Sequence, residues 1–274
     1  MPASPLPDPG PRATEQAAFD TARALQLAQQ TFDIEAAAIQ GLKARTGASF
    51  AQAVQAMLNV RGRVVVMGMG KSGHIGRKVA ATLASTGTPA MFVHPAEASH
   101  GDLGMIKPVD LVLAMSNSGE VDEVTTLLPV IKRMGVPLVA MTGNPQSTLA
   151  RHADIVLDSG VAQEACPLQL APTASTTAQL ALGDALAVAL LDARGFREED
   201  FARSHPGGGL GRKLLTHLGD VMHAKPRTIQ RDALAAEAAQ LMEQHRITSV
   251  LVVDETGHLC GAVNSNDLMR AKVI

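Results

Sequence analysis

Short, continuous apolar runs alternate with stretches of helical periodicity through the middle of the chain. Each run has the length of a strand that is buried on both faces. The runs lie at 64–67, 90–93, 111–115, 138–141 and 155–157. Strands of this kind, joined by helices, form a parallel sheet with helices on both faces. The pattern therefore predicts an α/β fold with a five-stranded parallel sheet, whose ligands bind at the carboxyl ends of the strands.

Helical patterns flank the predicted sheet. Helices are expected at about 14–43 and 49–60 before it, and a helix of small residues at about 174–193 after it. Near Thr216 the composition changes, and a tail begins with the pattern helix, strand, turn, strand and helix, its strands expected at 249–253 and 259–263. The predicted parts are a disordered proline-rich segment, an α/β domain with N-terminal helices and a small α+β unit, at 1–12, 13–216 and 217–274.

Two of the predicted strands run into turns of small polar residues. One turn is Ser116-Asn117-Ser118-Gly119-Glu120, and the other is Gly68-Met69-Gly70-Lys71-Ser72-Gly73. Backbone N–H groups and hydroxyls at the start of a helix bind anions, because the helix dipole and the unpaired amides both favour negative charge. Two such turns on neighbouring strands predict one phosphate pocket, with the hydroxyls of Ser72, Ser116 and Ser118 and the ammonium of Lys71 around it.

The glycine turn at 68–73 also fits two nucleotide-binding patterns in part. Gly68, Gly70 and Gly73 have the spacing of the dinucleotide fingerprint, but that fold needs an acidic residue about 20 positions further on. The second strand here ends in Val93-His94 instead. The Walker pattern fails as well, since Val65 stands where its first glycine is required. An anion-binding turn without a nucleotide is the remaining prediction.

Side chains suited to proton transfer follow several strands. His205 precedes Pro206-Gly207-Gly208, a backbone that is first rigid and then permissive, and histidine titrates near neutral pH. Glu123 follows the serine turn, and Glu164 follows the fifth strand. Either carboxylate could act in proton transfer or could simply complement a helix dipole.

Composition excludes several classes of protein. The formal net charge is −2 over 274 residues, without a polybasic segment or any Trp or Tyr, so nucleic acid is not an expected partner. The N-terminus lacks a signal-peptide pattern, and no run has the length of a membrane span. The two cysteines have no metal-ligand spacing. A cytoplasmic protein without a membrane partner is expected.

Five motifs, read in order from Gly68 to Leu215, closely resemble those of the arabinose 5-phosphate isomerases, which are sugar isomerase (SIS) domain enzymes. The resemblance extends from about Ile34 to Leu215. Its motifs are GMGKSGHIGRK, FVHPAEASHGDLGM, SNSGE, EACPLQLAPTASTTA and SHPGGGLGRKLL. It implies reversible conversion of D-ribulose 5-phosphate to D-arabinose 5-phosphate, a step toward the Kdo sugar of lipopolysaccharide or capsule.

The resemblance also implies roles for individual residues. Positions matching the family's catalytic residues are Lys71, Glu123, Glu164 and His205. Substrate contacts are expected at Ser72, Gly87, Thr88, His100, Ser116, Asn117 and Ser118. His94 matches a position that takes zinc in the family. That metal is expected to be incidental and no cofactor is required, because a base and an acid suffice for isomerisation through an enediolate.

The tail resembles a single CBS motif, whereas family members typically carry two. The matching stretches are 248–254 and 261–267. A single motif leaves exposed the face that normally packs on its twin, so pairing between subunits of a homo-oligomer, a tetramer, is expected. Asn264 replaces the hydroxyl residue of the nucleotide pattern while Asp267 remains. Oligomer formation is therefore the expected role of the tail, rather than control by an adenosine nucleotide.

Two alternatives stay open at the level of sequence. SIS domains also occur in regulators that bind phosphosugars without converting them, although the region 14–60 shows no clustered basic face for DNA. The substrate could also be another phosphosugar, such as sedoheptulose 7-phosphate.

Overall fold

The structure is a computed structural model that describes residues 19–205, 207 and 209–273. The chain divides into two compact units between Gly211 and Arg212. The sequence placed this change at 216–217. The expected disorder of residues 1–12 falls outside the described residues.

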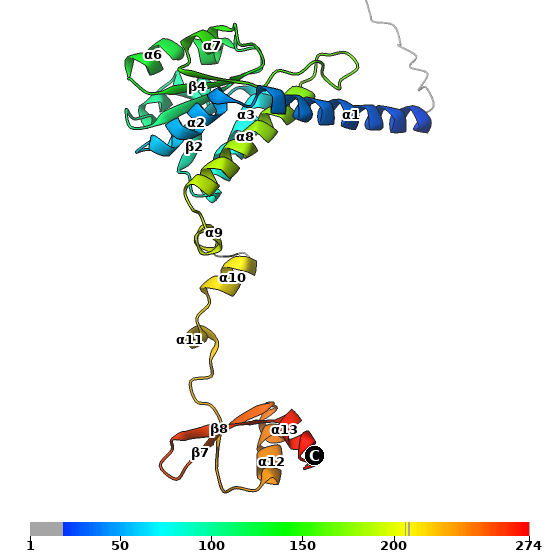
Figure 1. The fold of residues 1–274 in the computed structure, drawn as a ribbon, viewed down its shortest axis with the longest axis vertical. Helices are drawn as coiled ribbons and strands as arrows, with labels where there is room; N and C mark the ends of the chain where they lie inside the picture. Colours follow the sequence, from blue (N-terminus) through cyan, green and yellow to red (C-terminus); the bar gives the residue numbers. More distant parts are fainter. Residues whose placement is uncertain (1–18, 206, 208, 274) are drawn as a thin grey trace, which may run out of the picture. The chain divides into compact units, whose positions relative to one another are not determined.

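A parallel sheet of five strands forms the centre of the first unit, as predicted (Figure 1). The strands are β1 (Val64–Gly68), β2 (Ala90–Val93), β3 (Leu111–Met115), β4 (Leu138–Thr142) and β5 (Ile155–Asp158). Their order is β2-β1-β3-β4-β5. The chain leaves β1 toward one edge and later returns to the other side of β1, so the order reverses between β1 and β3. Ligands of open α/β sheets bind at such a reversal, beyond the carboxyl ends of the strands.

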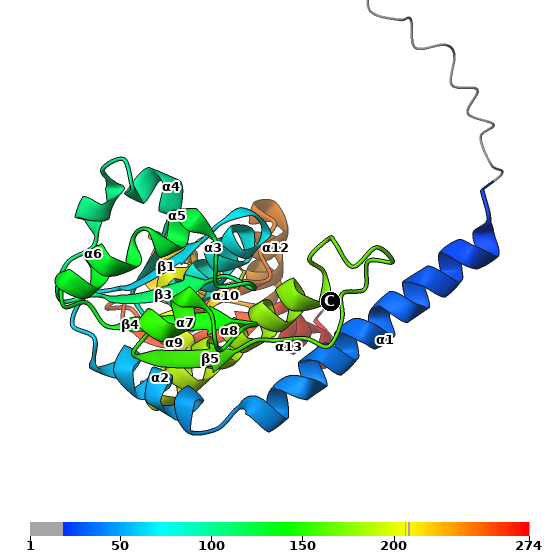
Figure 2. The same cartoon turned by 90° about the horizontal axis from the view of Figure 1, so that it is seen from above.

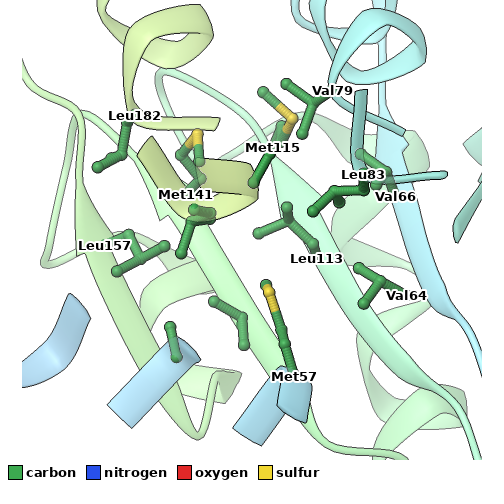
Figure 3. Close-up of a cluster of buried hydrophobic side chains, with 14 of the residues drawn as sticks. Met57, Val64, Val66, Val79, Leu83, Leu113, Met115, Met141, Leu157 and Leu182 are labelled. Atoms are coloured by element: carbon green, nitrogen blue, oxygen red, sulfur yellow. The ribbon is translucent and has the colours of Figure 1, made fainter. Parts of the chain in front are cut away.

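Helices cover both faces of this sheet. On one face lie α2 (Ala48–Asn59), α3 (Gly70–Ser85) and α8 (Ala174–Ala193). Alternate strand residues such as Val64, Val66 and Leu113 point into this layer and pack against Met57, Leu83 and Leu182 (Figure 3). The helices of the other face are α4 (Pro95–Ala98), α5 (Asp122–Thr125), α6 (Leu128–Arg133) and α7 (Thr148–His152), which cover Val65, Met67, Val112 and Ala140. The strands are continuous apolar runs because both of their faces are buried.

A long helix, α1 (Thr21–Arg45), precedes the sheet and extends beyond it (Figure 2). The N-cap Asp20 accepts a hydrogen bond from Arg23 N at 2.9 Å. Among the described residues only Leu42 of this helix is buried, and Leu25, Phe32 and Ile39 are exposed. Arg45 at its end donates to the Gly160 carbonyl and pairs with Asp158, which ties α1 to the segment after β5.

Several short helices were not predicted from sequence. They are the 3₁₀ helix η1 (Asp102–Met105), α9 (Glu198–Ser204), α10 (Gly209–Leu215) and α11 (Leu218–Val221). Helices of four to seven residues complete at most two turns, so they leave too short a pattern for apolar periodicity to reveal.

The second unit is a small α+β structure. Its sheet has the order β6-β7-β8, with strands Thr228–Gln230, Ser249–Val253 and Leu259–Asn264. The first pair is parallel and the second antiparallel. Helices α12 (Ala235–His245) and α13 (Ser265–Arg270) supply Met242 and Leu268 to a small core around Val250. Most of β8 is exposed.

Candidate active site

The two polar turns meet at the carboxyl ends of β1 and β3. The register pairs Gly68 with Met115, so both strands end side by side and both turns begin at the same level. A cavity of about 360 Å³ lies there. Its lining consists of Met69, Lys71, Ser72, Met115, Ser116, Asn117, Ser118, Val121 and Pro172. The structure thus brings together the five predicted residues of the two turns.

The turn after β1 owes its shape to close backbone approach. A β-carbon on Gly73 would lie 2.5 Å from the carbonyl oxygen of Gly68, so only glycine lets α3 start this close to the strand. Lys71 and Ser72 lie in the first turn of α3, where Lys71 is exposed and Ser72 half-buried. Unpaired N–H groups of that turn and the Lys71 ammonium make this end of the cavity favourable for an anion.

The serine turn is held by hydrogen bonds of its own. Ser116 is almost fully buried, and its Oγ accepts a bond from Gly119 N at 3.1 Å. Gly143 N donates to the Asn117 carbonyl at 3.0 Å, which anchors the turn to the end of β4. Asn117 and Ser118 are exposed at the cavity. Ser116 therefore shapes the turn, while Ser118, whose Oγ accepts from Glu120 N at 3.3 Å, still has its O–H to donate to a ligand.

Glu120, the last residue of the turn, was not assigned a role from sequence. Its Oε1 accepts a bond from Thr148 N at 2.8 Å, at the start of α7. Hydrogen bonds from the Thr148 side chain and backbone lower the pKa of Glu120 below its usual value. Leu149 N also donates to the Gly119 carbonyl at 3.0 Å. The serine turn is thus hydrogen-bonded to the start of α7. In the sequence, the glutamate that directly follows Gly119 is the feature that could have indicated this contact.

Glu164 is half-buried in the loop between β5 and α8. Its Oε2 accepts hydrogen bonds from Thr173 N at 2.7 Å, Thr173 Oγ1 at 2.9 Å and Ser175 N at 3.2 Å. Burial acts to raise the pKa of Glu164, but the hydrogen bonds from Ser175 and Thr173 outweigh it and hold the pKa below its usual range. Pro172, the residue before Thr173, lines the cavity. The Glu164 carboxylate is therefore bonded next to the lining without being part of it.

Glu123 lies near the cavity without being part of its lining, and His100 is also outside the lining. Glu123 is exposed in α5, two residues after Val121, which does line it. Among the described residues no hydrogen bond or ion pair to its carboxylate is present. His100 is exposed between α4 and η1.

His94 follows β2 and precedes α4, and its ring lies edge-on to Phe92. Its Nδ1 is buried and has no hydrogen-bond partner within the described part of the chain. A protein zinc site takes three or four ligands. No group of three or more His, Cys, Asp or Glu side chains that could hold a metal occurs among the residues described. The described residues of a single chain therefore do not fit the zinc that the resemblance implied, and no step of the chemistry depends on it.

Three predicted site residues lie at the opposite end of α8. This helix starts beside the cavity, spans about 30 Å at 20 residues, and is followed by Arg194, whose Nε donates to the fully buried Thr88 at 3.1 Å. A β-carbon on Gly87 would lie 2.5 Å from the Phe196 ring. His205 comes directly after α9 and stacks on Phe201 at 4.1 Å between ring centres. In one chain Gly87, Thr88 and His205 thus lie away from the cavity, a separation that the sequence did not predict.

Sequence reasoning also missed the apolar part of the lining. Met69, Met115, Val121 and Pro172 line the cavity beside the polar turns. Met69 is part of a predicted turn, and Met115 and Val121 adjoin the other, so all three could have been inferred from position. Pro172 carries no such signal, because it reaches the cavity only through the folding of the loop after Glu164.

In the second unit, the residues of the CBS nucleotide pattern serve a helix start. Asn264 Oδ1 accepts from Asn266 N and Asp267 N, and Asp267 Oδ2 accepts from Asn264 N at 3.0 Å. Asp267 Oδ1 also pairs with Arg270. The carboxylate that would hold a ribose is therefore engaged within its own helix.

Comparisons with known proteins agree on the family of both units. The SIS domain profile matches residues 57–189, and the CBS domain profile matches residues 218–274. Arabinose 5-phosphate isomerase KdsD of Pseudomonas aeruginosa is 57% identical over 249 residues, which cover 90% of this chain and 76% of the relative. The KdsD enzyme of Shigella flexneri is 45% identical over 316 positions, covering 91% of this chain and 96% of the relative.

The alignment with the Shigella enzyme is longer than this chain, so it contains positions that this chain lacks. Because 91% of 274 residues is about 249, roughly 67 of its 316 positions have no counterpart in this chain. The CBS match here spans residues 218–274, so the number of missing positions is close to the length of one CBS motif.

Among solved structures, the protein c3406 of E. coli CFT073 in complex with arabinose 5-phosphate is 40% identical, with a TM-score of 0.66, covering 69% of this chain and all of that one. A Listeria monocytogenes protein whose structure is described as that of a putative sugar-phosphate isomerase is 33% identical with a TM-score of 0.67, at the same coverage of this chain.

Proposed function

Because the chain belongs to the SIS-domain family of arabinose 5-phosphate isomerases, we propose that it interconverts D-ribulose 5-phosphate and D-arabinose 5-phosphate. The observation that carries the proposal is the meeting of two anion-binding turns at the β1/β3 switch point, with Lys71 beside them. The product would feed the synthesis of Kdo for lipopolysaccharide or capsule, as the KdsD relatives suggest.

The geometry supports a division of labour along the substrate. The phosphate would bind Ser72, Ser118 and the first amides of α3, held at the site that Ser116 shapes. Fixing the phosphate leaves the C1–C2 end free for the transfer of one proton through an enediolate. The Lys71 ammonium would stabilise the negative charge that develops on the oxygen during this transfer.

One of the two acid–base groups, His205, would come from a second subunit, and the other would be Glu123 or Glu164. The three predicted site residues that lie away from the cavity all belong to the far end of α8, where Thr88 bonds Arg194 and Gly87 meets Phe196. A neighbouring chain that presents this end to the cavity would add His205 together with Gly87 and Thr88. A homo-oligomer, with a tetramer as the expected form, would thus be required for activity.

The CBS unit would supply part of the assembly. Leu259 and Ala262 on β8 are exposed, and in a two-motif protein such a face packs on the other motif. Pairing with the same motif of another subunit would cover it. Zinc binding at His94 stays a prediction that needs further ligands from outside the single chain's described residues.

A cytoplasmic location is part of the same proposal. Cys166 and Cys260 are unpaired, which suits a reducing compartment. Within the described part of the chain one helix, α8, is long and apolar enough to cross a membrane, contrary to the expectation from sequence, but half of it is buried within its unit. We therefore propose neither a membrane nor nucleic acid as a partner.

One assay tests the activity directly. The purified chain is incubated with ribulose 5-phosphate in the presence of a chelator, and the products are separated by chromatography. We expect arabinose 5-phosphate and no ribose or xylulose 5-phosphate. Binding of ribulose 5-phosphate without turnover would favour a phosphosugar sensor. Conversion of sedoheptulose 7-phosphate but not of ribulose 5-phosphate, in a parallel incubation, would favour an isomerase of that longer sugar.

A further inference from the structure

Two carboxylates near the cavity are candidates for proton transfer, and their surroundings differ. Glu164 is fixed by three donors on one oxygen, from Thr173 N, Thr173 Oγ1 and Ser175 N. Glu123 is exposed on α5 and has no such donor among the described residues. All three bonds end on Oε2, and each stabilises the ionised carboxylate, so Glu164 is a weaker base than a carboxylate without such donors.

The donors of Glu164 identify what it holds. Thr173 and Ser175 are the N-cap and second residue of α8, and the Thr173 side chain makes no capping bond to the helix. The Glu164 carboxylate takes the place of that cap and compensates the positive end of the α8 dipole. It does so from nine residues earlier in the chain, so the bond closes the whole loop 164–173 onto the helix.

The rest of the loop is bound to the same point. Ala165 N donates to Thr173 Oγ1 at 2.8 Å. The Gln169 side chain both accepts from Glu164 N at 2.9 Å and donates to the Glu164 carbonyl at 2.8 Å. Gln169 itself has a positive φ of 56°. Pro172, which lines the cavity, is the residue before Thr173. The position of Pro172 in the cavity wall therefore depends on the hydrogen bonds between Glu164 and Thr173, which join the two ends of this loop.

We propose that Glu164 is a positioning residue, which holds the α8 start and the Pro172 wall of the cavity, and that it takes no part in proton transfer. This inference rests on the proposed isomerase function. It leaves Glu123 as the carboxylate that is available for the proton transfer. The lowered pKa of Glu164 agrees with this role, because a base works best when its pKa lies near the working pH.

The test compares amide and methyl replacements at Glu164. Glutamine keeps a carbonyl oxygen that can accept from Thr173 N and Ser175 N, but it cannot take a proton, whereas alanine can do neither. For a positioning residue we expect Glu164→Gln to keep kcat within about tenfold of wild type, with an unchanged pH profile of kcat. Loss of a general base would instead lower kcat by about 10²–10⁴-fold. Glu164→Ala should lower the thermal midpoint and raise KM.

Two matched variants complete the experiment. Thr173→Val removes the hydroxyl and keeps the size of the side chain; it should reproduce part of the KM increase of Glu164→Ala, and the double variant should be no worse than Glu164→Ala. Glu123→Gln should lose activity by the factor expected of a base. A folded Glu164→Gln protein that loses kcat as strongly as Glu123→Gln overturns the inference. A wild-type protein that makes no arabinose 5-phosphate overturns the proposed function instead, so the two failures are distinguishable.

Discussion

Gly119 and Ser147 lie so close together that a β-carbon on Gly119 would come within 3.0 Å of the Ser147 side chain. Gly119 also has a positive φ of 68°. Ser147 is fully buried and caps α7 by accepting a bond from Ala150 N at 3.2 Å. The contact fixes the serine turn against the start of α7, which is itself held by burial and by the capping bond.

The first prediction concerns this contact. Gly119→Ala should destabilise the protein by about 2–4 kcal/mol, because it adds backbone strain and a steric clash. It should also raise KM, because the serine turn must shift. Gly135→Ala is the matched control, since Gly135 has φ of 69° and open space around its β-position. Urea denaturation should show only the strain, about 1 kcal/mol, in the control; equal losses in both variants would contradict the clash.

A second prediction separates the two serines of the turn. Ser118→Ala should raise KM and leave stability within about 0.5 kcal/mol, because Ser118 is exposed at the cavity. Ser116→Ala should raise KM and also cost about 1–3 kcal/mol, because it removes the acceptor of Gly119 N in a buried place. Steady-state kinetics and urea denaturation measure the two effects. An equal loss of stability in both variants would count against the assigned roles.

The third prediction is a pH dependence of stability. Burial acts to raise the pKa of Asp154, but hydrogen bonds from Lys132 and Leu138 N outweigh it and lower the pKa. A carboxyl whose pKa is lower in the folded state stabilises the fold above its unfolded pKa, near about 4, and loses that contribution as the pH falls through the folded value. Asp154→Asn should therefore have a lower free energy of unfolding than wild type at pH 7, and this difference should shrink below about pH 4. A constant difference would refute the linkage.

Shared active sites give the fourth prediction. Lys71→Ala and His205→Ala should each be inactive alone. After the two are unfolded and refolded together, mixed oligomers contain cavities with a native Lys71 from one chain and a native His205 from the other. Activity should then rise well above the sum of the two preparations. Differently tagged chains that co-purify but stay inactive would show that each cavity uses its own histidine, or none.

The fifth prediction addresses the CBS unit. Leu259 is 65% exposed on β8, so Leu259→Asp should weaken pairing without disturbing the fold, and light scattering should report a smaller assembly. Lys225→Asp, at an exposed position before β6, is the control and should leave the assembly unchanged. A wild-type chain that is monomeric at micromolar concentration would contradict the pairing itself.

The sheet could be predicted almost residue by residue. All five strands occur at the predicted runs, and β1, β4 and β5 are each one residue longer, because a strand buried on both faces is a continuous apolar run that few other elements imitate. The helix at 174–193 was also predicted within its observed bounds.

The site was predictable only where it is local in sequence. Both polar turns, and thus Ser72, Ser116 and Ser118, follow from strand ends and small residues. The Glu164–Thr173 bond depends on how the ten-residue loop 164–173 closes, for which the sequence has no periodic signal. The distance between the cavity and His205 depends on the length and direction of α8, which only the folded chain reveals.

That helix has a consequence for how the sequence can vary. It is anchored at both ends, by Glu164 at its start and by the bonds of Arg194 to Thr88 and to the Met57 carbonyl at its end. Inserting one residue between the anchors would turn one end by about 100° relative to the other and displace it by about 1.5 Å. Substitutions along α8 are therefore tolerable where packing allows, whereas a change in the number of its residues would put the two anchors out of phase.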